Sequence, residues 1–222
     1  MKTKIALFDL DHTLIPFDSD YEWNEFTIKL GWRDGDAFRQ ANEAFFAQYR
    51  DGKLNIYEYV RFATQAMRDK GAIESIAARA LFMSASVLKG IQKSALDLVQ
   101  SHQRAGELVA IVTATNEFVT RPIADAFGVE ELIAIDLVRD AQGEFTGEIL
   151  GTPSFREGKV TRVEAWLAAR DLSWQGVETT FYSDSMNDLP LLEKATHPVA
   201  TNPDARLRQL ANERGWRILD LF

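Results

Sequence analysis

From about residue 91 to the end of the chain, segments with helical periodicity alternate with short apolar runs. The helical segments are 91–106, 117–128, 156–172, 186–195 and 203–215, and the apolar runs are 107–115, 132–138, 179–185, 197–201 and 216–221. Strands that alternate with helices are typical of a parallel sheet covered by helices on both faces. We therefore expect an α/β fold with a Rossmann-like parallel sheet, and a strand pair or irregular hairpin over 143–153.

The opening of the chain adds one more strand and then a long interruption. Residues 4–9 form an apolar run without alternation, which predicts a buried strand of the same sheet. From there to residue 86, apolar and aromatic residues recur every three or four positions, which predicts about four short helices and no strand. We therefore expect a core formed by residues 1–15 and 87–222, with a helical insertion over 16–86.

The composition argues against several classes of protein. The chain has 222 residues, a net charge of -8 and a pI of about 5.0, which argues against a nucleic-acid or membrane-surface binder. It contains no cysteine, which excludes disulfides and thiolate metal sites. No apolar run approaches the roughly 20 residues of a membrane-spanning helix, and the N-terminus does not resemble a signal peptide. We therefore expect a cytoplasmic protein.

Polar residues gather where the expected strands end, which is where ligands of open parallel sheets bind. They are Asp9, Asp11 and Thr13 after the first strand, Thr113 in the second, and Asp184, Asn187 and Asp188 after a later one, with Lys159 in the preceding helix. Each has a structural alternative, since acids at strand ends also form solvated turns or cap helices and a helix lysine is usually exposed. Their ordered appearance at successive strand ends favours one common site.

Carboxylates that converge on one site need a counter-charge. Two unit charges about 4 Å apart repel by about 4 kcal/mol at an effective dielectric near 20. A divalent cation relieves this repulsion, and oxygen ligands without cysteine or paired histidine favour Mg²⁺. The three histidines, His12, His102 and His197, show no metal-ligand spacing. We therefore expect a magnesium site at this edge of the sheet.

This arrangement resembles the haloacid dehalogenase superfamily of aspartate-nucleophile phosphatases over the whole chain. DLDHT (9–13) matches the first motif, Thr113 the second, Lys159 the third and DSMND (184–188) the fourth. The helical insertion resembles the small all-helical C1 cap of the phosphoserine-phosphatase-like subfamily IB.

Three further stretches resemble a subgroup in which several members are histidinol-phosphatases. They are DSDYEWNEF (18–26), ATNEFVTRPIADAFGVEELIA (114–134) and TPSFREGKV (152–160). The chain departs from the superfamily pattern at Ser183, where many members have glycine, and at the variable position His12. We expect neither residue to take part in the chemistry.

The resemblance implies a Mg²⁺-dependent phosphomonoester hydrolase that forms an aspartyl-phosphate. Asp9 is then the nucleophile and Asp11 the general acid and base, while Thr113 and Lys159 hold the transferring oxygens. The implied metal ligands are the side chains of Asp9 and Asp184 and the main-chain carbonyl of Asp11, with Asp188 a ligand through water or a neighbour of the ligands. Asn187 and Ala114 are implied contacts of the phosphate.

The substrate is expected to be a small phosphomonoester that bears an amine, with histidinol phosphate favoured over phosphoserine. Acids at 18, 20 and 22 lie where the insertion leaves the core. They are either solvated residues that cap the next helix or a pocket for the amine, and the resemblance favours Asp18 for this role. Arg61 is either a substrate-carboxylate ligand, as phosphoserine requires, or a solvated helix residue.

Other functions remain open at the level of sequence. A phosphotransferase or mutase would use the same aspartyl-phosphate but exclude water. A non-catalytic phosphate-binding regulatory protein is a different class, which the complete set of catalytic positions disfavours. A P-loop nucleoside triphosphatase is also disfavoured, because GKV (158–160) lacks the spaced glycine and the Ser or Thr after the lysine.

Overall fold

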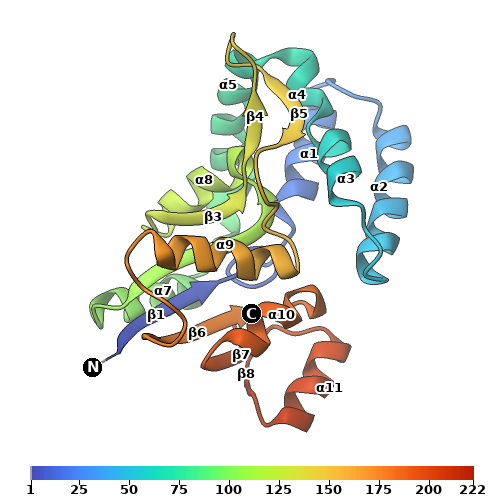
Figure 1. The fold of residues 1–222 in the computed structure, drawn as a ribbon. Coiled ribbons are helices and arrows are strands. Elements are labelled where there is room, and N and C mark those ends of the chain that lie inside the picture. The colour runs from blue at the N-terminus through green and yellow to red at the C-terminus, as the bar shows by residue number, and fades with distance from the viewer. Residues whose placement is uncertain (1) are drawn as a thin grey trace.

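The computed structural model describes residues 2–222 and shows the expected α/β fold (Figure 1). One parallel sheet has the strand order β3-β2-β1-β6-β7-β8. Its strands are β1 (Thr3–Phe8), β2 (Leu108–Asn116), β3 (Glu131–Ile135), β6 (Val177–Ser183), β7 (His197–Thr201) and β8 (Arg217–Leu219). The first strand therefore lies inside the sheet, between β2 and β6.

Strand β1 supplies side chains to both faces of the sheet, which explains its unbroken apolar run. Ala6 and Phe8 pack in the hydrophobic cluster with α7 (Lys93–Arg104) and α8 (Glu117–Ala126). Ile5 and Leu7 pack in the opposite cluster, which contains side chains of α9 (Glu157–Ala168), α10 (Leu189–Lys194) and α11 (Ala205–Arg214). Helices therefore cover both faces, and Asp9 follows a strand buried on both sides.

The segment expected to be a helical insertion contains no strand within the described residues, as predicted. It has five α-helices where about four were expected, because one helical stretch divides at Thr64. They are α1 (Ser19–Lys29), α2 (Gly35–Arg50), α3 (Ile56–Ala63), α4 (Gln65–Lys70) and α5 (Ala72–Phe82), followed by a π-helical turn (Met83–Val87) and α6 (Leu88–Gly90). The buried Trp23 ring packs edge-on against Phe82 and Phe118, so these helices rest on α8.

The apolar run 132–138 forms two strands, although one was expected. It gives β3 of the main sheet and β4 (Leu137–Arg139), which pairs with β5 (Phe145–Ile149) in a separate antiparallel hairpin. Asp136 interrupts the apolar run, and its carboxylate lies 2.7 Å from Arg162 of α9. Strand β5 contacts α3 and α4, so the hairpin extends beside the helical segment (Figure 1).

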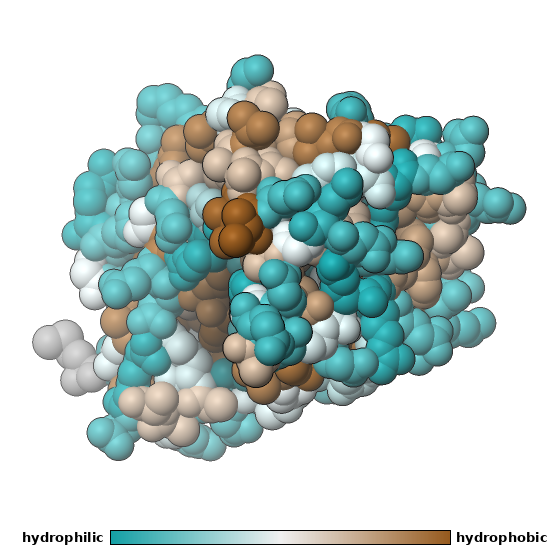
Figure 2. Space-filling model, turned by 90° about the horizontal axis from the view of Figure 1, so that it is seen from above, coloured by the Kyte–Doolittle hydropathy of each residue, from teal (hydrophilic) through white to brown (hydrophobic). Residues whose placement is uncertain are grey.

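Hydrophilic side chains cover much of the face shown in Figure 2, with apolar side chains between them. Among residues 2–222, no helix combines the length and the apolar character that crossing a bilayer requires.

Candidate active site

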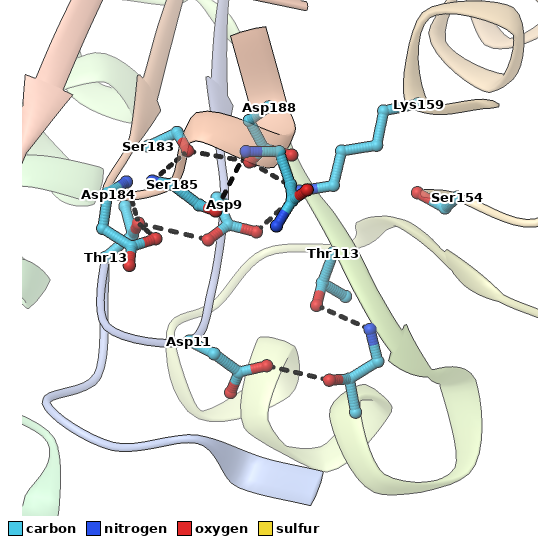
Figure 3. A network of polar contacts seen from close by, with 12 residues as sticks. Asp9, Asp11, Thr13, Thr113, Ser154, Lys159, Ser183, Asp184, Ser185 and Asp188 are labelled. Carbon is cyan, nitrogen blue, oxygen red and sulfur yellow. Dashed lines mark hydrogen bonds and ion pairs between the residues drawn. The ribbon is translucent and has the colours of Figure 1, made fainter. Parts of the chain in front are cut away.

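Strand β1 brings Asp9 to the carboxyl edge of the sheet, where its N–H donates to the Tyr182 carbonyl of β6 at 2.9 Å. Asp9 as a whole residue is 7% exposed. Lys159, which is 2% exposed, lies in the first turn of α9 and donates from Nζ to Asp9 Oδ1 and to Asp188 Oδ2, both at 2.8 Å. Three segments far apart in the chain therefore meet at one buried ammonium group (Figure 3).

Thr13 joins Asp9 to Asp184. Its hydroxyl oxygen lies 3.2 Å from Asp9 Oδ2 and 3.3 Å from Asp184 Oδ1, and it accepts the N–H of Asp184 at 3.1 Å. The hydroxyl has one proton for two carboxylates, so it can donate to only one of them at a time. The side chains of Asp9 and Asp184 therefore both lie beside the Thr13 hydroxyl (Figure 3).

The carboxylates of this cluster outnumber its single lysine. Burial raises the pKa of Asp184 well above its usual value, and repulsion from Asp9 and Asp188 raises it further. Burial raises the pKa of Asp188 to about 6, although Lys159 opposes the shift. Burial alone would lower the pKa of Lys159, but Asp188 and Asp9 outweigh it and raise that pKa. The cluster therefore has an excess of negative charge that favours a bound cation.

The donor set fits Mg²⁺ better than a metal that needs a closed protein cage. Within the described part of the chain, no three His, Asp or Glu side chains are placed so that together they could hold a metal ion. Mg²⁺ is usually held by one or two carboxylates and keeps several waters. Asp9 and Asp184 provide such a pair, whereas the Asp188 carboxylate is engaged by Lys159 and Ser183.

The Asp11 side chain points away from this cluster (Figure 3). Its carboxylate accepts from Thr115 Oγ1 at 2.8 Å and from the N–H of Ser19 at 2.7 Å. Burial, and then repulsion from Asp18, raise the pKa of Asp11 to about 6. Thr113 is buried, and its Oγ1 accepts the N–H of Thr115 at 3.1 Å.

Strand β2 continues to Asn116 and does not end near Thr113, and its pairing with β3 shifts register in this stretch. Ala114 lies inside the strand, between Thr113 and Thr115, and Thr115 contacts Asp11.

The other expected substrate contacts have partners within the protein. Asn187 donates from Nδ2 to the Tyr49 carbonyl at 3.3 Å. Asp18 caps α1 by accepting the N–H of Tyr21 at 2.8 Å. Arg61 forms an exposed ion pair with Glu148 of the hairpin at 2.7 Å, which corresponds to its solvated alternative.

Three residues of this site were not assigned a role from the sequence. Ser183 is one of them, and its hydroxyl donates to Asp188 Oδ2 at 2.8 Å. Thr115 holds Asp11, and its position two residues after Thr113 in an extended segment was an available signal. Tyr49 comes from α2 and places its hydroxyl 3.1 Å from Ser185 Oγ, a contact across 136 residues that no local pattern indicates.

Comparisons with known proteins agree with this geometry. A family model described as haloacid dehalogenase-like hydrolase matches residues 6–193. A histidinol-phosphatase of Neisseria meningitidis serogroup C is 40% identical over 217 residues, which cover 97% of this chain and 98% of that protein. A crystal structure of a protein of unknown function from Bordetella pertussis Tohama I covers 100% of both chains, with 45% identity and a TM-score of 0.93.

A more distant structure, a phospho-aspartyl intermediate analogue of phosphoserine phosphatase, covers 100% of this chain and 95% of its own. Its TM-score of 0.71 at 18% identity shows that the two chains share a fold. The family match spans the segments that supply Asp9, Lys159, Asp184 and Asp188 to the cluster. The chain therefore belongs to the haloacid dehalogenase-like hydrolase family, among its phosphatases.

Proposed function

We propose that this phosphatase is a Mg²⁺-dependent phosphomonoesterase that forms an aspartyl-phosphate on Asp9 and acts on histidinol phosphate. The observation that supports it most is the buried contact of Asp9 with both Lys159 and Thr13 at the carboxyl edge of the sheet. Lys159 holds the Asp9 carboxylate in one orientation and supplies positive charge beside the attacking oxygen.

In the first step an Asp9 carboxylate oxygen forms a bond to phosphorus while the bond to the ester oxygen breaks. The leaving alkoxide takes a proton from Asp11, and the phosphoryl group remains on Asp9. In the second step water gives its proton to Asp11 and attacks phosphorus, which releases phosphate and regenerates the Asp9 carboxylate. Lys159 and the Thr113 hydroxyl stabilise the oxygens of the transferring group.

Asp11 must turn away from Thr115 and Ser19 to reach the leaving oxygen, because its carboxylate is held by both groups here. Hydrogen bonds of catalytic groups often tighten only in the substrate complex, so this position is compatible with the role. A pKa of about 6 also suits a group that must donate a proton and then accept one near neutral pH.

Mg²⁺ would be held by the side chains of Asp9 and Asp184 and the Asp11 carbonyl, and it would screen the negative charge of the phosphate from the carboxylates. Asp188, joined to Lys159, keeps the ammonium group between itself and Asp9.

The amine of the substrate would be recognised by Asp18 and its neighbours at the start of α1. Burial, and then repulsion from Asp20, raise the pKa of Asp18, so a cationic ligand would relieve an unfavourable charge. The 40% identity to a histidinol-phosphatase over nearly the whole chain supports the same substrate. Phosphoserine is the alternative, and it would require a carboxylate ligand such as Arg61.

The nucleophile assignment is tested by assaying Asp9→Ala with p-nitrophenyl phosphate and Mg²⁺. We expect kcat to fall by about 10³-fold or more, because the covalent step has no other carboxylate in place. Asp97→Ala, which removes an exposed acid of α7, is the control and should keep wild-type activity. Near wild-type activity in Asp9→Ala would exclude this mechanism.

The substrate is tested by measuring phosphate release from histidinol phosphate, phosphoserine and other small esters. Histidinol phosphate should give the highest kcat/KM, with Arg61→Ala unchanged. A preference for phosphoserine that is lost in Arg61→Ala would favour the alternative substrate. Binding of phosphate without turnover of any ester would instead favour the non-catalytic regulatory class.

A further inference from the structure

The end of α2 lies against the loops that position the catalytic groups. The Tyr49 hydroxyl is 3.1 Å from Ser185 Oγ, and its carbonyl accepts from Asn187 Nδ2 at 3.3 Å. Arg156 donates from Nη1 to the Gly52 carbonyl at 2.7 Å, just after the same helix. The helical segment therefore contacts both the loop after β6 and the segment that precedes Lys159.

A continuous polar path leads from Tyr49 to the catalytic lysine. The N–H of Ser185 donates to Ser183 Oγ at 3.2 Å, and the Ser183 hydroxyl donates to Asp188 Oδ2 at 2.8 Å. The same Asp188 oxygen accepts from Lys159 Nζ at 2.8 Å. A displacement of Ser185 would therefore also displace the carboxylate of Asp188, which orients Lys159.

The Tyr49 hydroxyl lies close to the acidic cluster and keeps its proton. Burial raises its pKa, and the carboxylates of Asp188, Asp184 and Asp9 raise it further. It can therefore act as a hydrogen-bond donor to Ser185 at neutral pH.

The backbone on the core side of this contact is strained. Arg156 has φ 52° and ψ -122°, a conformation that residues other than glycine rarely adopt. Such a conformation persists only where the surroundings impose it, and the bond from Arg156 to Gly52 is one such restraint. The segment around Arg156 is therefore held in its conformation in part by its contact with the residues just after α2.

We propose that Tyr49 is a positioning residue of the reaction, which holds through Ser185 the loop that contains Asp184 and Asp188. The Tyr49 hydroxyl, which comes from helix α2 outside the sheet, thereby helps to fix the positions of Asp184 and Asp188. The loop reaches its catalytic geometry only while the end of α2 rests on it.

The proposal is tested with Tyr49→Phe, which removes only the hydroxyl, and with Tyr57→Phe, an exposed tyrosine of α3, as the control. The kinetic measurements with these variants rest on the proposed Mg²⁺-dependent activity. With p-nitrophenyl phosphate we expect kcat to fall by about three- to tenfold, as for the loss of one neutral hydrogen bond, with KM for the ester unchanged. The Mg²⁺ concentration for half-maximal activity should rise, which a mere loss of folded enzyme would not produce.

A double-mutant cycle localises the effect. Because Tyr49 acts through Ser185, Tyr49→Phe should cost little in the background of Ser185→Ala. Additive losses, or a raised KM for the ester with normal kcat, would indicate direct contact with the substrate and overturn the positioning role.

Amide hydrogen exchange tests the same contact without any activity. Peptides that cover residues 183–189 should exchange faster in Tyr49→Phe than in wild type or Tyr57→Phe, while peptides of β1 stay unchanged. Equal exchange in all three proteins would overturn the proposal. Faster exchange in a protein that hydrolyses no ester would support the loop contact and refute the proposed function instead.

Discussion

The segment that follows β1 contributes one aspartate to each of two groups of three, and the groups differ in how their charge is balanced. Asp9, Asp184 and Asp188 surround Lys159, which bonds directly to two of them. The other group is Asp11, Asp18 and Asp20, at the base of α1. Among the described residues its hydrogen bonds come only from neutral donors, which are main-chain N–H groups and the side chains of Thr115, Tyr59 and Asn116.

The difference indicates two uses of the same residue type. In the first group the positive charge of Lys159 opposes the rise in pKa that burial causes at Asp188 and Asp184. In the second group burial and mutual repulsion raise the pKa of Asp11 and of Asp20 to about 6. In the proposed mechanism, a pKa near 6 suits the exchange of a proton between Asp11 and the leaving group.

Removing the cation of the first group should have the largest effect. Lys159→Met leaves Asp9 and Asp188 buried without their partner, so the free energy of unfolding at pH 7.5 without Mg²⁺ should fall by about 3 kcal/mol or more. Activity should fall by about 10²-fold or more. Chemical denaturation measures the first effect, and added Mg²⁺ should restore part of the stability.

Lys93→Met is the matched control, because this lysine forms an exposed ion pair within α7 and should matter little. An equally stable Lys159→Met protein would show that the first group does not need its built-in cation.

The raised pKa of Asp20 in the second group should make the free energy of unfolding depend on pH. Burial raises the pKa of Asp20 from 3.8 to about 6, so the folded protein binds this proton more tightly than the unfolded chain. Stability from this group is therefore lost as pH rises from about 4 to about 6 and stays lost above. Asp20→Asn should be more stable than wild type by about 1 to 2 kcal/mol at pH 7.5, with no difference near pH 4.

Denaturant titrations at the two pH values measure this effect, and Asp36→Asn, at an exposed acid of α2, should show none. A variant destabilised equally at both pH values would mean that the bonds to Tyr59 and Asn116 matter more than the charge.

The smallest effect on stability is expected at Asp18. Asparagine is as good a helix cap as aspartate and carries no buried charge, so Asp18→Asn should keep the cap and should not lower the melting temperature. If Asp18 binds the substrate amine, KM for histidinol phosphate should rise about five- to tenfold while p-nitrophenyl phosphate is hydrolysed normally. Asp34→Asn caps α2 in the same way and is the control. An unchanged KM would assign Asp18 to capping alone.

Sequence patterns predicted the parts of this molecule that depend on regular spacing. Apolar runs located the sheet, and the polar residues at their ends pointed to Asp9 and Asp184, because parallel strands end at one edge. Lys159 was predicted from the helix that precedes one of these strands. The division at Asp136 was missed because an apolar run does not show which sheet a strand joins.

The details of the site were harder to predict because they depend on side-chain partners distant in the chain. The orientation of Asp11 depends on Thr115, which is 104 residues away. The contact of Tyr49 with Ser185 depends on where a whole helix rests, which no local periodicity contains.

The β4–β5 hairpin has a consequence for exchanging parts between relatives. Glu144 of its turn accepts the N–H of Ala72 at the start of α5, at 2.6 Å, and Glu148 pairs with Arg61 of α3. Phe145 packs edge-on against Phe118 beneath the helices. A chimera that imports residues 16–86 alone would set foreign helices against a native hairpin. An exchange of substrate preference between homologues should therefore succeed only when residues 137–149 are exchanged together with residues 16–86.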